Sequence, residues 1–115
     1  MTNDKKTIGI STANAKHLAD LVSRGRFATE LDAAKFAMAH AISVGTAPRA
    51  SESTETKWNV GSVDPDGTLR SILEALYPDT AEPYRLAEYL MNHGIELLSQ
   101  STSDPYALLS SAMQG

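Results

Sequence analysis

Three histidines and fourteen carboxylates are the side chains of this sequence that could bind a metal ion or transfer a proton. His17, His40 and His93 stand far apart in the chain, and there is no cysteine to complete a ligand set with them. Metal sites draw their ligands from short helical or looped spacings, which these histidines lack. We therefore predict no metal site, and we interpret His40 as a packed or interface residue.

The segment Asp64-Pro65-Asp66-Gly67 has two of the acidic residues of a calcium-binding loop. Its glycine falls too early, and Ala75 stands where such a loop places its final glutamate. We interpret this segment as a helix cap that follows a turn. The sequence also lacks the nucleophile elbow, the phosphate-binding loop and the dinucleotide fingerprint, so we predict a protein that is not an enzyme and has no cofactor.

The charges are distributed unevenly along the chain. Residues 1–49 carry seven basic and four acidic side chains, a net charge of +3, whereas residues 50–115 carry three basic and ten acidic ones, a net charge of −7. A basic segment is suited to contact phosphate, although a solvated surface with segregated charges gives the same pattern. The basic residues proposed for phosphate contact are Lys5, Lys6, Lys16, Arg24 and Arg26.

The hydrophobic periodicity predicts a mainly α-helical protein with one short N-terminal strand followed by about five helices. Residues 6–11 alternate as a half-buried strand does, and 46–57 are polar and aperiodic. Ser11 or Thr12, Thr29 and Asp64 are the predicted helix N-caps. The predicted helices are 12–24, 29–44, 64–77, 80–99 and 106–113, with a short extended or turn segment at 58–63.

The second predicted helix is apolar on more than one face. A chain of 115 residues has limited apolar surface with which to cover such a helix. We therefore predict a homodimer or higher oligomer with this helix at its centre. The alternative is that the C-terminal helices cover it within one chain. The predicted interface residues are Leu31, Ala34, Phe36, Ala37, Met38, Ala41 and Ile42.

A strand, a helix, a turn with Gly25 and a second, Ala-rich helix resemble the ribbon-helix-helix family, and the stretch 21–30 is similar to its ParD-type antitoxin branch. In that family two chains pair their strands into a ribbon that enters the major groove of DNA. The resemblance implies that Thr7, Gly9 and Ser11 face the bases.

The layout of residues 6–98 also resembles the DndE family of DNA sulfur-modification accessory proteins. The segments that carry this likeness are Trp58-Asn59-Val60-Gly61 and Leu90-Met91-Asn92-His93-Gly94-Ile95. The two resemblances together imply a role in a DNA-modification, defence or toxin–antitoxin system.

We therefore expect a single domain that comprises a ribbon-helix-helix-like part (1–45), a polar loop (46–57) and an acidic helical part (58–115). Its expected function is that of a small DNA-binding regulator with self-association. The alternative is a protein-interaction module whose acidic C-terminal helices bind a partner protein, with little or no DNA binding. No apolar run approaches the roughly 20 residues of a membrane-spanning helix, so we expect no membrane contact and a cytoplasmic location.

Overall fold

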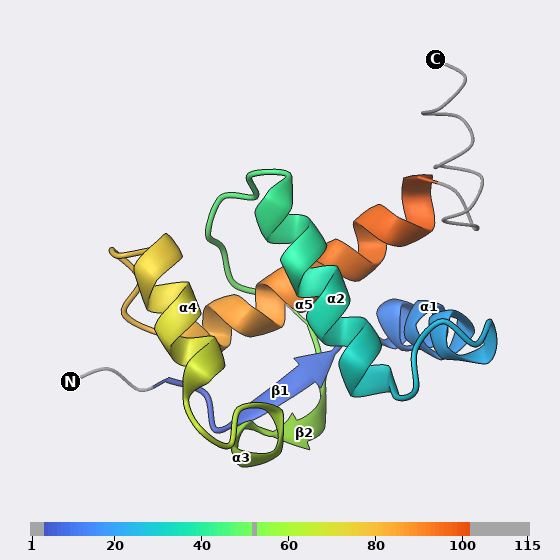
Figure 1. Cartoon of the computed structure of the whole chain (residues 1–115), viewed down its shortest axis with the longest axis horizontal. Coiled ribbons are helices and arrows are strands. Elements are labelled where there is room, and N and C mark those ends of the chain that lie inside the picture. The colour runs from blue at the N-terminus through green and yellow to red at the C-terminus, as the bar shows by residue number, and fades with distance from the viewer. Residues whose placement is uncertain (1–3, 52, 102–115) are drawn as a thin grey trace.

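The computed structural model describes residues 4–51 and 53–101 and shows a mainly helical chain with one small sheet (Figure 1). The predicted fold class is confirmed. The predicted helix 106–113 lies outside the described residues. The elements, in chain order, are β1 (Thr7–Ile10), α1 (Thr12–Ser23), α2 (Glu30–Ser43), β2 (Glu55–Asn59), α3 (Val60–Val63), α4 (Thr68–Leu76) and α5 (Pro83–Ser101).

Local capping fixes the starts of the first two helices. Ser11 accepts the backbone N–H of Asn14 at 3.2 Å, and Thr29 accepts that of Asp32 at 3.1 Å. Each bond satisfies an N–H group that has no partner within its own helix. Both predicted caps are therefore confirmed, and the two helices lie close to their predicted bounds.

The sheet has two antiparallel strands, β1 and β2, and both belong to this chain. Ile8 pairs with Trp58 and Ile10 with Glu55, with an irregularity between Ile8 and Gly9. The predicted loop 46–57 is thus too long by three residues, because Glu55, Thr56 and Lys57 belong to β2. Their exposed side chains show no hydrophobic alternation, so the pairing with β1 defines this strand.

The helix predicted over residues 64–77 begins later in the structure. Helix α4 starts at Thr68 rather than at Asp64, because residues 65–67 form a turn and Gly67 has a φ of 76°. The Asp64 side chain still caps α4 from across this turn. The segment predicted as extended at 58–63 is divided between the end of β2 and the short helix α3.

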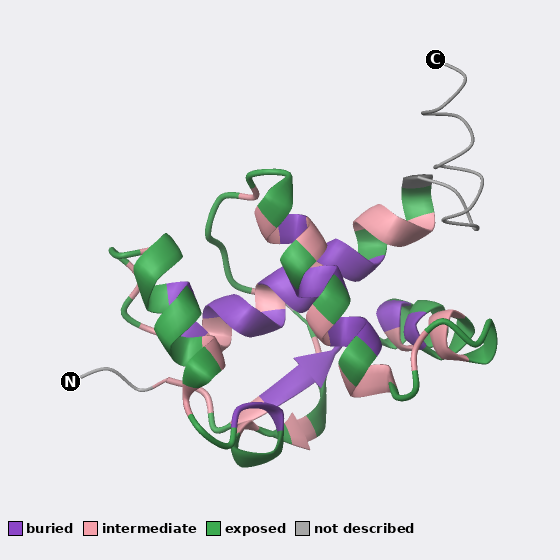
Figure 2. Ribbon diagram, in the orientation of Figure 1, coloured by how far each residue is buried: buried purple, intermediate pink, exposed green. Residues whose placement is uncertain are grey.

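Helix α5 is the central element of the fold. It crosses behind α2 in Figure 1, with α4 beside its start and α1 nearer its other end. Leu90, Met91 and Ile95 of α5 are fully buried, as are Ile8 of β1 and Leu18 of α1. Figure 2 shows this buried band along α5, β1 and the facing side of α2. The core is therefore built around α5.

Candidate functional site

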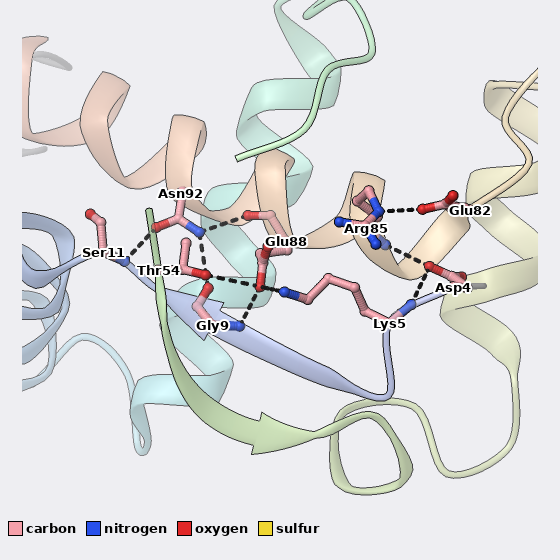
Figure 3. Close-up of polar contacts among 9 residues, drawn as sticks. All are labelled: Asp4, Lys5, Gly9, Ser11, Thr54, Glu82, Arg85, Glu88 and Asn92. Carbon is pink, nitrogen blue, oxygen red and sulfur yellow. Dashed lines mark hydrogen bonds and ion pairs between the residues drawn. The ribbon is translucent and has the colours of Figure 1, made fainter. Parts of the chain in front are cut away.

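Groups of the same chain contact both edges of strand β1 (Figure 3). One edge pairs with β2, and the other receives side chains of α5 in place of a further strand. Glu88 Oε1 accepts the Gly9 N–H at 2.7 Å, Asn92 Nδ2 donates to the Gly9 carbonyl at 3.0 Å, and the Ser11 N–H donates to Asn92 Oδ1 at 3.0 Å. In this structure β1 therefore pairs within its own chain, whereas the ribbon-helix-helix resemblance implies pairing with the strand of a second chain.

Glu88 is the hub of these contacts. It is 2% exposed, and its Oε1 lies 2.8 Å from Lys5 Nζ and 3.4 Å from the Thr54 hydroxyl, which donates to it. A carboxylate in such a place needs a cation and hydrogen-bond donors to offset its lost hydration. Lys5, predicted to contact phosphate, is therefore engaged with a buried carboxylate.

The other residues predicted to contact nucleic acid lie in several different environments. Gly9 is buried, and a Cβ atom there would lie 2.6 Å from Thr54 Oγ1, so its predicted position facing the bases is wrong. Ser11 is occupied as the cap of α1, and Arg24 forms an ion pair with Asp20 at 3.2 Å. Of the remaining predicted residues, Thr7 is half-buried, whereas Lys6, Lys16 and Arg26 are exposed.

The predicted cationic residues do not gather on one side. Figure 1 places the start of β1, next to Lys5 and Lys6, and the turn between α1 and α2, which holds Arg24 and Arg26, at opposite sides of the view. Moreover, at least five of the ten basic side chains form ion pairs with residues that the structure describes. These five are Lys5, Arg24, Lys57, Arg70 and Arg85. DNA binding stays a prediction, and the geometry offers it little support.

The apolar helix α2 is covered by α5 of the same chain. Ala34, Ala37, Met38 and Ala41 are buried in this packing, so their assignment to an interface between chains is wrong. A Cβ atom at Gly94 would overlap the carbonyl group of Ala37, which shows how closely the two helices approach. Of the other predicted interface residues, Leu31 and Ile42 are half-buried against the same core, and Phe36 is exposed beside Phe27.

Asp64 holds the start of α4, as its interpretation as a helix cap predicts. Its two oxygens accept the N–H groups of Leu69 at 2.9 Å and Arg70 at 3.0 Å, and the Tyr84 hydroxyl donates to it at 2.8 Å. Burial of the carboxyl group by itself raises its pKa, but the three hydrogen bonds outweigh burial, and the pKa of Asp64 lies below its ordinary value. Burial and the bond to Asp64 raise the pKa of Tyr84 to about 12, so this phenol remains a donor at neutral pH.

Helix α4 leaves an apolar stripe in contact with solvent. Leu73 is fully buried, whereas Ile72 is 45% and Leu76 is 53% exposed. They lie four residues apart, on one side of a helix. Among the described residues, large hydrophobic side chains are this exposed only here and at Phe36 and Val44.

A groove of about 630 Å³ adjoins Leu76, between the α4–α5 connection and residues 48–50. Apolar side chains form much of its lining, and its charged residues are the carboxylates of Asp79 and Glu82 and the guanidinium groups of Arg49 and Arg85. The hydroxyl of Tyr77 donates to the Thr46 carbonyl at 3.0 Å and so fixes the end of α4 to the segment that follows α2. The apolar residues of this groove include Pro48, Leu76, Tyr77, Pro78, Ala81 and Leu86.

Two buried amides, Asn14 of α1 and Asn92 of α5, were not identified from the sequence as site residues. Asn14 Nδ2 donates to the side-chain oxygen of Asn92 at 3.0 Å and to Glu96 at 3.3 Å. Asn14 precedes Leu18 by one helical turn, so its place on the apolar stripe of α1 was the available signal. A polar residue on such a stripe indicates a buried hydrogen-bond network.

The described residues contain no group of three or more His, Asp or Glu side chains that could hold a metal ion. Within the same part of the chain, no helix is both long and apolar enough to cross a membrane. Comparison with known proteins gives no match to a family model, to a curated protein or to a solved structure. The resemblances to the ribbon-helix-helix and DndE families therefore stay predictions.

Proposed function

We propose that this protein is a non-enzymatic interaction module that binds a basic, amphipathic segment of a partner protein. The binding surface in this proposal is the acidic face, defined as residues 64–82, which comprise α4 and its flanking turns. The observation that supports it best is the half-exposed stripe of Ile72 and Leu76 on a helix with Leu73 in the core. An amphipathic partner segment would bury its own apolar side chains against such a stripe and the groove beside it.

The charge of the acidic face supports a basic partner. The acidic face carries five carboxylates and one basic residue, Arg70, a net charge of −4. Arg70 is itself 3.6 Å from Glu74, and Arg85, just beyond the face, pairs with Glu82. A partner with lysine or arginine beside its apolar anchors would meet this negative potential favourably, whereas nucleic acid would be repelled. The carboxylates are Asp64, Asp66, Glu74, Asp79 and Glu82.

A direct test uses a synthetic amphipathic helical peptide with leucine on one face and lysine on the other. A second peptide has glutamate in place of lysine. Fluorescence anisotropy should show saturable binding of the lysine peptide only. The double variant Ile72→Ser/Leu76→Ser should weaken this binding at least about ten-fold, because two apolar anchors lose their partners.

Phe36→Ser is the matched control, since Phe36 is 50% exposed but lies on α2 beside Phe27. Equal loss for the control and the double variant would contradict the proposal. A random DNA duplex supplies the competing outcome. Binding to it that falls steeply between about 50 and 200 mM salt would favour the DNA-binding function instead.

A further inference from the structure

The two walls of the groove beside Leu76 differ in how they are held. One wall belongs to α4, α5 and the connection between them, and it includes Leu86, which is only 3% exposed. The other wall is formed by residues 48–50, in the segment that follows α2. Figure 1 shows this segment leaving the end of α2 on the side towards α4. We call residues 47–51 the strap.

The strap has few contacts that hold it in place. None of its residues forms a hydrogen bond or an ion pair with a described residue. Four of its five residues are exposed, and none belongs to the hydrophobic core or packs against it. A segment with an exposed backbone and few tertiary contacts opens locally at a low cost in free energy. The strap is therefore the adaptable wall of the groove.

Thr46, directly before the strap, is fixed on both sides of its peptide backbone. Its N–H donates to the Ala41 carbonyl at 3.2 Å, which ties it to the end of α2. Its carbonyl accepts the Tyr77 hydroxyl at 3.0 Å, and Tyr77 is the C-cap residue of α4. The bond from Tyr77 thus joins the two walls at the point where the strap begins.

We infer that Tyr77 is a positioning residue for partner binding, because it fixes the strap at Thr46 and so lets the strap close on an apolar side chain of the partner segment opposite Leu86. This inference rests on the proposed function, since Leu76 and Tyr77 belong to the acidic face. A groove of about 630 Å³ lies within the size range of ligand pockets and admits an aromatic ring. Closure orders the strap, and the entropy cost is smaller when one end is already fixed.

The first measurement is cleavage of the full chain by an arginine-specific protease, because Arg49 stands in the middle of the strap. Arg24, in the exposed turn between α1 and α2, is the internal reference. Tyr77→Phe should raise the rate of cleavage after Arg49 about three-fold or more relative to cleavage after Arg24. A general loss of stability would raise both rates together.

The second measurement uses the lysine peptide that tests the acidic face, which an arginine-specific protease leaves intact. Bound peptide should slow cleavage after Arg49 about ten-fold and leave cleavage after Arg24 unchanged. Tyr77→Phe should weaken peptide binding about five-fold, because the strap then has to be fixed when the partner binds.

Tyr84→Phe is the matched control, since it removes a hydroxyl bond of 2.8 Å at the other end of α4. It should change the peptide affinity and the ratio of the two cleavage rates by less than about two-fold. A loss of affinity as large as that of Tyr77→Phe would assign the effect to stability and would overturn the inference.

Two further outcomes would overturn it. One is the same ratio of cleavage rates in the wild type and Tyr77→Phe, and the other is a bound peptide that leaves Arg49 unprotected. A lysine peptide that does not bind the wild type would instead overturn the proposed function and, with it, the role of Tyr77 in binding. The cleavage ratio of the free protein would still decide whether Tyr77 fixes the strap.

Discussion

Glu88 is the residue on which the polar contacts between β1 and α5 converge. It receives the Gly9 N–H at 2.7 Å and Lys5 Nζ at 2.8 Å, and its side chain is 3% exposed. An ionised carboxylate in such a place is tolerated only while its partners remain. Lys5 therefore contributes to the fold, and its replacement tests this structural role.

Lys5→Met should lower the free energy of unfolding by about 3 kcal/mol, because it leaves the buried Glu88 without its cation. Urea denaturation measures the change. Lys6→Met is the matched control, since exposed Lys6 forms no ion pair with a described residue, and its effect should stay within about 0.5 kcal/mol. Adding Glu88→Gln to Lys5→Met should restore part of the loss. Equal effects of the two lysine variants would contradict the role of Lys5.

Among the elements, α2 and α5 cross at close range. Gly94 faces the backbone of Ala37, and alanines on α2 continue the narrow contact. Backbone cannot shift as a flexible side chain can, so the crossing requires glycine at this position.

Gly94→Ala should destabilise the protein by about 3 kcal/mol, the upper end of the usual cost of overpacking, because the added methyl group collides with backbone. Gly61→Ala is the control, since a Cβ atom there meets nothing within 4 Å and α3 is helical. That substitution should be neutral or stabilise by up to about 1 kcal/mol. A Gly94→Ala variant with the wild-type denaturation midpoint would rule out this packing.

The start of α4 should make the stability depend on pH. The pKa of Asp64 is lowered in the folded chain, so its stabilising effect is complete above its ordinary pKa of 3.8 and is lost as the pH falls through the folded value. Asp64→Asn should therefore cost about 1 kcal/mol at pH 7, and the difference from wild type should shrink below about pH 4.

Thermal denaturation across this pH range checks the effect. Asp79→Asn provides the comparison, because Asp79 is an exposed carboxylate for which the structure shows no such cap. A difference between wild type and Asp64→Asn that stays constant from pH 7 to about pH 2 would contradict the assignment.

For the molecule as a whole, the coverage of α2 by α5 removes the physical argument for a dimer built on α2. The helix that was expected to need a second chain already has its cover. We therefore expect sedimentation at micromolar concentration to give the 12.3 kDa monomer.

Met38→Glu should lower the stability of that monomer by several kcal/mol, because it places a charged group at a core position that is only 5% exposed. Phe36→Glu, on the exposed side of the same helix, should have little effect. A dimer that Met38→Glu separates into folded monomers would support the interface between chains instead.

The sequence by itself determined the local features of this protein. The caps at Ser11, Thr29 and Asp64, and the turns at Gly25 and Gly45 with φ of 75° and 78°, depend on groups a few residues apart. Such signals act over at most six residues of chain, and they predicted most of the helices and the fold class.

Only the tertiary structure decided what covers α2, what contacts the edges of β1 and which segments line the groove beside Leu76. Glu88 and Asn92 reach Gly9 across 79 and 83 residues of chain, and Gly94 meets Ala37 from another helix. An apolar face has the same composition whether α5 or a second chain covers it, because burial is not directional. The identity of its cover is therefore a property of the packed chain.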